Sequence, residues 1–191
     1  MATNISKQGV AFASGNVNPN LLKGSYMTLT QTTDGSSYAE FTIPDISGIV
    51  DGVKLVVSVD IELYNVASMS RIGCEPSFPT SGGTRYIGVW TSTTTSRKKR
   101  IFQVYTMQGN ATSVGQHGIY IQGVTFGEGG GYIKLSNPKL EFGIYPTPWV
   151  PHTTDDIYVG NTNGFFEITN PLGTDANIAK EYMSANQFYE L

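Results

Sequence analysis

Residues 53–64 read Val-Lys-Leu-Val-Val-Ser-Val-Asp-Ile-Glu-Leu-Tyr, and this stretch decides the fold class. Its odd-numbered positions, from Val53 to Leu63, are all aliphatic, whereas most of its even-numbered positions are polar. This period of two predicts a β-strand with one buried face, because helical spacing would scatter the aliphatic side chains around a cylinder.

Shorter runs rich in β-branched and aromatic residues predict further strands along the chain. They cover residues 26–30, 38–43, 71–75, 86–90, 101–107, 119–126 and 131–142. Clusters of turn-forming residues separate them at 34–35, 76–83, 91–96, 108–115 and 127–131. We expect the glycine-rich cluster 127–131 to be a hairpin tip, and Asn137-Pro138 to be a kink or bulge. Strands without intervening helices predict an all-β antiparallel sandwich or barrel.

The two ends of the chain differ from this pattern. Residues 1–19 are polar and weakly patterned and are predicted to form an N-terminal arm, followed by one main domain over residues 20–156. Residues 157–191 are predicted to be a C-terminal extension with one short helix over 175–190, capped by Thr174.

The composition and net charge of the chain argue against several classes of protein. Only 14% of the residues are charged and 12% are aromatic, which argues against disorder, and the net charge of -3 argues against a dedicated nucleic-acid binder. No apolar run approaches the roughly 18 residues of a membrane span, and we expect no secretory signal. The single cysteine, Cys74, excludes an internal disulfide and is expected to be a small buried side chain.

Charge is distributed unevenly. Residues 1–140 carry 11 basic and 8 acidic groups, whereas residues 141–191 carry 1 basic and 7 acidic groups, so the end of the chain is predicted to present a different kind of surface. The basic run Arg97-Lys98-Lys99-Arg100 is typical of a solvated loop end that leads into a strand. The alternative, a contact with an anionic polymer, has weaker support in a lone run of four.

Catalytic chemistry has little support. His117 lies in a predicted turn and His152 in a Pro-rich segment, where a surface role outweighs that of a general base. Asp60 and Glu62 are two residues apart on one strand face, as a glycosidase pair would be, but no sequence feature distinguishes an acid from a base. We therefore predict no catalytic residue and no enzyme activity.

A binding face is better supported. The side of each predicted strand opposite its aliphatic side carries rings and polar groups that suit a sugar, whose C–H face packs on rings and whose hydroxyls bond carboxylates, amides and guanidinium groups. The predicted carbohydrate-binding residues, on the condition that their strands share one sheet, are Asp60, Glu62, Tyr64, Arg71, Glu75, Tyr86, Trp90, Tyr120 and Gln122. Alternatively, each ring caps a sheet edge or fills a gap beneath a loop, with its polar tip in water.

The segment 137–156 resembles the closing segment of carbohydrate-binding modules in tail and baseplate proteins of bacteriophages of Gram-positive hosts. The matching residues are Lys139, Leu140, Glu141, Gly143, Thr147, Trp149, Pro151 and Asp155. The opening Asn20-Leu21-Leu22 also resembles the start of such modules. The family usually has a charged residue where Phe142 stands, and the 35 residues after Asp156 have no counterpart in it.

The resemblance implies a jelly-roll β-sandwich that binds saccharides and is attached to virion proteins that contact the host wall. It implies a structural role for Trp149, in a strap that holds the chain end to the sandwich. Some related modules carry a structural calcium ion, but no calcium ligand set is clear in this sequence, so we predict no cofactor and no metal ligand.

The resulting functional hypothesis is a non-catalytic carbohydrate-binding protein of a phage or prophage tail or baseplate that recognises host-surface saccharide during adsorption. Its expected partners are cell-wall or surface polysaccharide, further copies of itself, and other virion proteins contacted through residues 1–19 and 157–191, with neither nucleic acid nor membrane among them. The alternative is a structural virion protein that uses the same sandwich as an assembly adaptor. A third reading is an accessory module separated from a glycan-degrading enzyme.

Overall fold

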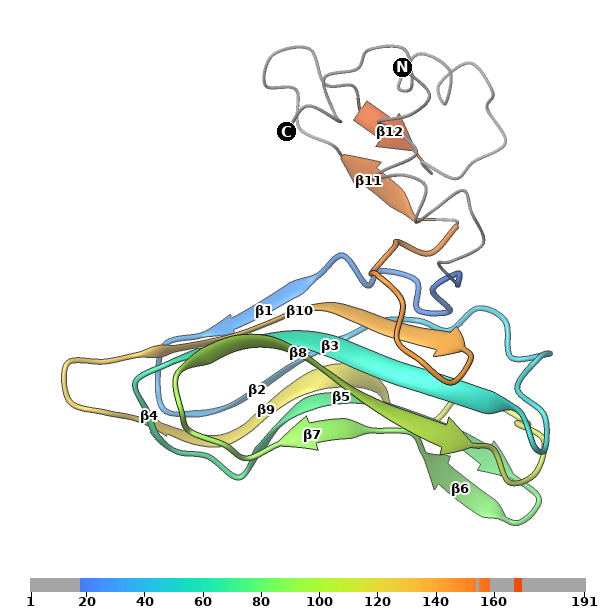
Figure 1. Ribbon diagram of the computed structural model, residues 1–191, viewed down its shortest axis with the longest axis horizontal. Coiled ribbons are helices and arrows are strands. Elements are labelled where there is room, and N and C mark those ends of the chain that lie inside the picture. Colours follow the sequence, from blue (N-terminus) through green and yellow to red (C-terminus); the bar gives the residue numbers. More distant parts are fainter. Residues whose placement is uncertain (1–17, 154, 159–166, 170–191) are drawn as a thin grey trace.

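The computed structural model describes residues 18–153, 155–158 and 167–169. Antiparallel strands form two facing layers (Figure 1). The first layer has the order β1-β10-β3-β8, made of β1 (Thr28–Gln31), β10 (Tyr132–Phe142), β3 (Lys54–Tyr64) and β8 (Arg97–Thr106). The second layer has the order β2-β9-β5-β6, made of β2 (Gly35–Glu40), β9 (His117–Phe126), β5 (Arg71–Thr80) and β6 (Gly83–Tyr86).

Shorter strands complete the arrangement. In the second layer, β4 (Val66–Ser68) pairs with β9 and β7 (Val89–Thr91) pairs with β5. Beyond the sandwich, β11 (Asp156–Tyr158) pairs with β12 (Glu167–Thr169). The fold is therefore the predicted all-β jelly-roll sandwich. Most of the predicted arm, up to residue 17, and the predicted helix over 175–190 lie outside the described residues, and the part of the chain that is described holds no helix able to cross a membrane.

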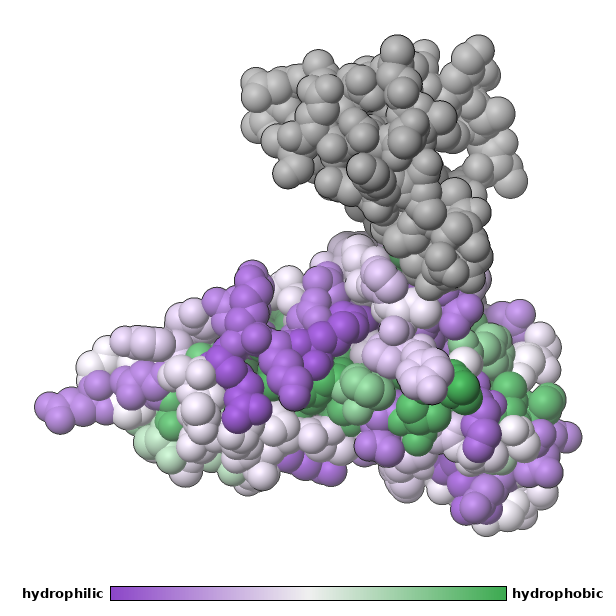
Figure 2. Space-filling view, viewed as in Figure 1, coloured by the Kyte–Doolittle hydropathy of each residue, from purple (hydrophilic) through white to green (hydrophobic). Residues whose placement is uncertain are grey.

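The core lies between the two layers. The odd-numbered residues of β3, from Leu55 to Leu63, point into it and are at most 3% exposed, which confirms the alternation predicted for this strand. Opposite them lie Ile72 and Cys74 of β5 and the aliphatic residues of β9. Figure 2 shows hydrophobic residues reaching the surface along the seam between the layers, with hydrophilic residues on either side. Cys74 is fully buried, as predicted, and burial raises the pKa of its thiol.

The Asn137-Pro138 bulge reverses which side of β10 faces the core. The register with β3 shifts between Ser136 and Lys139, and Asn137 has a left-handed backbone with φ of 54°. Leu135, before the bulge, and Leu140, after it, both point inward. Lys139 and Glu141 therefore point outward. The predicted bulge is confirmed.

The chain closes by covering that outward side. The side chains of Lys139 and Glu141 form an ion pair at 3.1 Å, and both are fully buried. Residues 143–153 and 155, here called the closing segment, follow β10, and two of them contact the pair: Thr147 donates its backbone N–H to Glu141 Oε1 (2.8 Å), and Lys139 Nζ donates to the carbonyl of Pro148 (2.8 Å). The part of the resembling segment that follows β10 is thus a strap on the first layer.

Asn20 joins the start of the domain to its end. Its buried amide donates to the carbonyls of Pro138 and Val150 (both 3.1 Å), while its oxygen accepts from the backbone N–H groups of Leu22 and Leu140. Trp149 Nε1 donates to Ser25 Oγ (3.3 Å), so this indole takes part in the same closure. Asp155, 2% exposed, accepts from Gly24 N–H at 2.8 Å.

Several predicted turns are wrong. The cluster 76–83 is mostly strand, because β5 continues through its prolines, whose carbonyls remain acceptors: that of Pro76 accepts from Ile87 N–H and that of Pro79 from Thr112 N–H. The predicted strand 86–90 is divided between β6 and β7. The basic run 97–100 is the start of β8, rather than a loop end leading into it.

Two predicted turns connect strands of different layers. The cluster 127–131 is no hairpin tip: it leads from β9 in the second layer to β10 in the first, and the amide of Asn65 holds it by donating to the carbonyls of Glu128 and Gly130. The turn at Asp34-Gly35 likewise leads from β1 in the first layer to β2 in the second. His117, predicted in a turn, is the first residue of β9.

Candidate functional site

Three rings lie side by side on the outer face of the second layer. They are Tyr38 of β2, Tyr120 of β9 and Trp90 of β7, here called the aromatic row. The ring centroids of Tyr38 and Tyr120 are 6.2 Å apart with planes at 21°, and those of Tyr120 and Trp90 are 5.9 Å apart with planes at 38°. Strand register produces the row, because Tyr38 is paired with Tyr120, and Gly73 of β5 is paired with both Tyr120 and Trp90.

Gly73 has no side chain, which leaves space above β5 for the Trp90 ring. A Cβ atom at this position would lie 2.9 Å from Trp90 Cε3 and 1.9 Å from the carbonyl oxygen of Val89. Gly118 serves Tyr120 in the same way, since a Cβ atom there would lie 3.1 Å from the phenol oxygen. Gly73 therefore lets the Trp90 ring of the neighbouring strand β7 lean over the backbone of β5, and Gly118 lets the Tyr120 ring lean along its own strand, β9.

Polar groups fix the orientation of Trp90. Its indole N–H donates to Glu75 Oε2 at 3.0 Å. The guanidinium carbon of Arg71 lies 4.0 Å from the centroid of its ring, and Arg71 Nε donates to Gln122 Oε1 at 2.8 Å. A cation over an indole face is a favourable contact, and the bond to Gln122 prevents the guanidinium from rotating away.

Two carboxylates flank Tyr120. Glu40 and Glu75 are both paired in register with Gly118, over which the Tyr120 ring leans. Burial, together with the negative charges of Glu40 and Glu75, raises the pKa of the Tyr120 hydroxyl. The hydroxyl therefore stays protonated at neutral pH and can both donate and accept a hydrogen bond.

Six of the nine predicted site residues lie on this outer face. They are Arg71, Glu75, Tyr86, Trp90, Tyr120 and Gln122. Tyr86 of β6 lies farther along the face, opposite Ser77, and is 56% exposed. Tyr38 and Glu40 also lie on this face and were not among the predicted site residues, although residues 38–43 alternate Tyr, Glu and Thr with Ala, Phe and Ile, a pattern that places both on the outer face.

The expectation that all nine residues share one face is wrong, because β3 belongs to the first layer. Its carboxylates are engaged there: Asp60 accepts from Arg100 and Asn137 (both 2.9 Å), and Glu62 accepts from the Tyr132 hydroxyl (2.8 Å). The Tyr132 hydrogen bond, ahead of the nearby lysines, lowers the pKa of Glu62. Tyr64 stacks on Tyr132 with ring centroids 5.8 Å apart.

Two hollows adjoin the outer face of the second layer. The first, of about 510 Å³, lies at the Trp90 end of the aromatic row. We call it the Arg71 pocket; its lining residues are Ser70, Arg71, Trp90, Thr91, Ser92 and Thr93. The second, of about 350 Å³, lies between β2 and the end of the closing segment and shares Glu40 with the face of the row.

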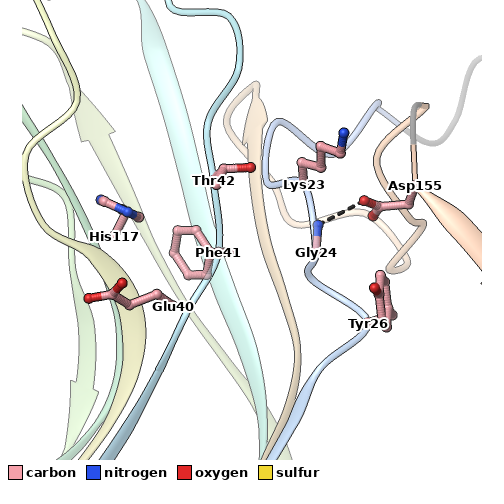
Figure 3. A pocket seen from close by; sticks show the side chains of 8 residues that line it. All are labelled: Lys23, Gly24, Tyr26, Glu40, Phe41, Thr42, His117 and Asp155. Carbon is pink, nitrogen blue, oxygen red and sulfur yellow. Dashed lines mark hydrogen bonds between the residues drawn. The ribbon is translucent and has the colours of Figure 1, made fainter.

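Figure 3 shows the second hollow, with Glu40 and His117 on one side and Lys23, Tyr26 and Asp155 on the other. Its most buried polar groups already have partners. Asp155 accepts from the backbone N–H groups of Gly24 and His152, and His117 Nδ1 lies 2.6 Å from the carbonyl oxygen of Gly115. This hollow contains none of the three rings of the aromatic row.

In the part of the chain that the structure describes, no group of three or more His, Cys, Asp or Glu side chains could hold a metal ion. His117 and His152 lie on different segments, β9 and the closing segment. What this surface offers is a set of flat rings, with a guanidinium at one end and carboxylates beside the middle ring.

No family model matches the sequence, and neither does any curated protein. Among solved structures, the tripod from the baseplate of bacteriophage Tuc2009 is similar over 71% of this chain and 59% of its own, with a TM-score of 0.46 and 20% identity. The chain thus spans less than two thirds of that protein. Family 16 carbohydrate-binding module 2 is similar over 64% of this chain and 85% of its own (TM-score 0.39, 6% identity).

A third similar structure is the C-terminal family 22 carbohydrate-binding module of a Clostridium thermocellum protein, which matches over 64% of this chain and 79% of its own (TM-score 0.35, 15% identity). The structural neighbours of this sandwich thus include a phage baseplate protein and carbohydrate-binding modules.

Proposed function

We propose that the chain is a non-catalytic carbohydrate-binding protein, and that a saccharide lies across the aromatic row. The observation that carries the proposal is the row itself: rings from three strands lie on one outer face, beside Glu40, Glu75 and Arg71. A pyranose has apolar C–H faces and a rim of hydroxyls, and the row supplies a partner for each.

The row is also open to a ligand. Tyr38 is 64% exposed, and Tyr120 and Trp90 are half-buried. An open site of this kind is expected to bind with roughly -4 to -8 kcal/mol, which corresponds to millimolar to micromolar affinity. Several copies held together would convert such weak binding into firm attachment through effective concentration.

We place this activity on a phage or prophage tail or baseplate, where it would serve adsorption to the host surface. The segment 137–156 supports that setting through its resemblance to baseplate carbohydrate-binding modules. The extension after Asp156 would connect the domain to other virion proteins. Peptides of this chain should then be found by mass spectrometry of purified particles induced from the host.

The saccharide site is tested with a glycan array of bacterial surface and plant polysaccharides, followed by calorimetry on the best-binding glycan. Tyr38→Ala and Trp90→Ala should each weaken binding about 2- to 12-fold, because each removes a ring contact worth about 0.5–1.5 kcal/mol. Thermal unfolding of each variant separates loss of contact from loss of fold.

Tyr64→Ala is the matched control, since Tyr64 is an exposed tyrosine on the opposite layer. It should leave binding unchanged. If Tyr64→Ala abolishes binding while Tyr38→Ala and Trp90→Ala have no effect, the saccharide site lies on the first layer and the proposed site is wrong.

A further inference from the structure

We infer that the Arg71 pocket binds an anionic group, a carboxylate or a phosphate, carried by the saccharide on the aromatic row. The inference rests on the proposed function and names its substrate class: an acidic or phosphorylated glycan. The pocket adjoins the row, because Trp90 both lines the pocket and forms the end of the row. A sugar on the Trp90 ring would therefore carry its substituent towards Arg71.

Arg71 is held for recognition. Trp90 supports the flat side of its guanidinium at 4.0 Å, and Gln122 accepts from Nε at 2.8 Å. These two contacts hold the guanidinium, which belongs to the lining of the pocket, and the bond to Gln122 uses only the Nε donor. The two Nη groups carry the other four N–H donors of an arginine. A fixed guanidinium fork matches the two oxygens of a carboxylate or phosphate and gives a bidentate, charge-assisted contact.

Hydroxyl groups complete a donor-rich lining. Thr93 Oγ1 accepts from Arg97 Nη2 (2.8 Å). This bond does not use the hydroxyl hydrogen of Thr93, which can be donated to a ligand. Arg97 also places a second positive charge behind Thr93.

The sign of the charge changes along the row. The lining of the Arg71 pocket contains no carboxylate, whereas Glu75 holds the indole N–H and, with Glu40, flanks Tyr120. An anion would be repelled beside Tyr120 and attracted beside Arg71. The ligand should therefore bind in one orientation, with its anionic group at the Trp90 end.

Three small probes test this in the full chain: methyl β-glucuronide, glucose 6-phosphate and the neutral methyl β-glucoside. Nuclear magnetic resonance titrations follow the indole N–H of Trp90 and the Nε–H of Arg71. At least one anionic probe should bind at least about 5-fold more tightly than the glucoside, and comparison of the two distinguishes carboxylate from phosphate. Raising the salt concentration to 0.5 M should remove that advantage, because screening weakens ion pairing.

Arg71→Gln should remove the preference for the anionic probe, so that the anionic probe and the glucoside bind this variant with affinities within about 2-fold of each other. Gln122→Ala, which releases the Nε anchor, should reduce the preference and provides a second variant should Arg71→Gln unfold. Lys99→Gln, which removes an exposed cation from β8 of the other layer, is the matched control.

The inference is overturned if the glucoside binds as tightly as both anionic probes, or if anion binding is unchanged in folded Arg71→Gln. Either result leaves the proposed function intact as long as the glucoside still shifts Trp90. Conversely, if inorganic phosphate shifts Arg71 while no saccharide of the array contacts the aromatic row, the pocket is an anion site and the proposed function fails.

Discussion

Lys139 and Glu141 show how a charged pair can serve closure of a fold. Their side chains are fully buried, and desolvation lowers the pKa of the Lys139 ammonium, an effect that the neighbouring Glu141 charge partly offsets. Backbone and hydroxyl groups of Thr147 and the carbonyl of Pro148 satisfy the remaining hydrogen-bonding capacity of the pair. The pair therefore specifies where the closing segment lies.

Breaking this pair on one side should cost more stability than most single substitutions. Lys139→Met leaves Glu141 charged and buried, and we expect the free energy of unfolding in urea to fall by about 3–5 kcal/mol. The double variant Lys139→Met with Glu141→Leu should lose less than the sum of the two single losses, because no uncompensated charge remains.

Lys98→Ala is the matched control for that cycle. Lys98 is paired with Glu62 at 3.5 Å, but its side chain is 82% exposed, so its removal should cost less than about 1 kcal/mol. Equal losses for Lys98→Ala and Lys139→Met would contradict the stabilising role assigned to the buried pair.

At the scale of the element, the closing segment should make stability depend on pH. Burial, followed by the charge of Lys23, lowers the pKa of His152, and the nearby Asp155 partly opposes this. As pH falls below about 6.5, His152 takes up a proton in the unfolded chain before it does so in the folded one. The unfolded state then binds more protons, so the folded state loses stability over this window.

Urea unfolding at pH 7.5, 6.5 and 5.5 measures this loss. Wild type should lose more stability between pH 7.5 and 5.5 than His152→Gln, which cannot take up that proton. An identical pH dependence in both proteins would show that His152 does not contribute.

Some strands could be predicted from the sequence and others could not. Residues 53–64 gave a clear prediction of β3, because one face of the strand is buried along its length and the alternation is complete. The course of β5 through 76–80 could not be predicted, since prolines usually interrupt a strand and the N–H groups that donate to their carbonyls belong to distant residues. Which strands pair depends on such non-local contacts.

At the scale of the whole molecule, the candidate site could be predicted only in part, because which strands share a sheet depends on non-local contacts. Outward-facing rings and polar groups could be identified strand by strand, and six of the nine lie on one face. Asp60, Glu62 and Tyr64 show the same alternation but lie on the opposite outer face. A sandwich has two such faces, and nothing within a single strand tells them apart.

Closure and proposed binding occupy opposite layers, and both use residues before 157, so truncation after Asp156 separates them from the C-terminal extension. We expect a chain that ends at Asp156, and so keeps the bond from Gly24 to Asp155, to unfold at the same urea concentration as the full chain and to bind the same glycans. Incorporation into virions, measured by mass spectrometry of purified particles, should be lost with residues 157–191. Lost glycan binding in the folded, truncated chain would place the saccharide site in the extension instead.

The amide of Asn20 has a consequence for how this protein is made. One of its acceptors, the carbonyl of Val150, lies 130 residues farther along the chain. Strand β1 likewise pairs with β10, which is synthesised about a hundred residues later. During translation, the early strands must therefore remain incomplete until nearly the whole domain has left the ribosome exit tunnel. In that interval the nascent chain exposes unpaired strand edges, so slow synthesis would favour association with chaperones or with neighbouring nascent copies.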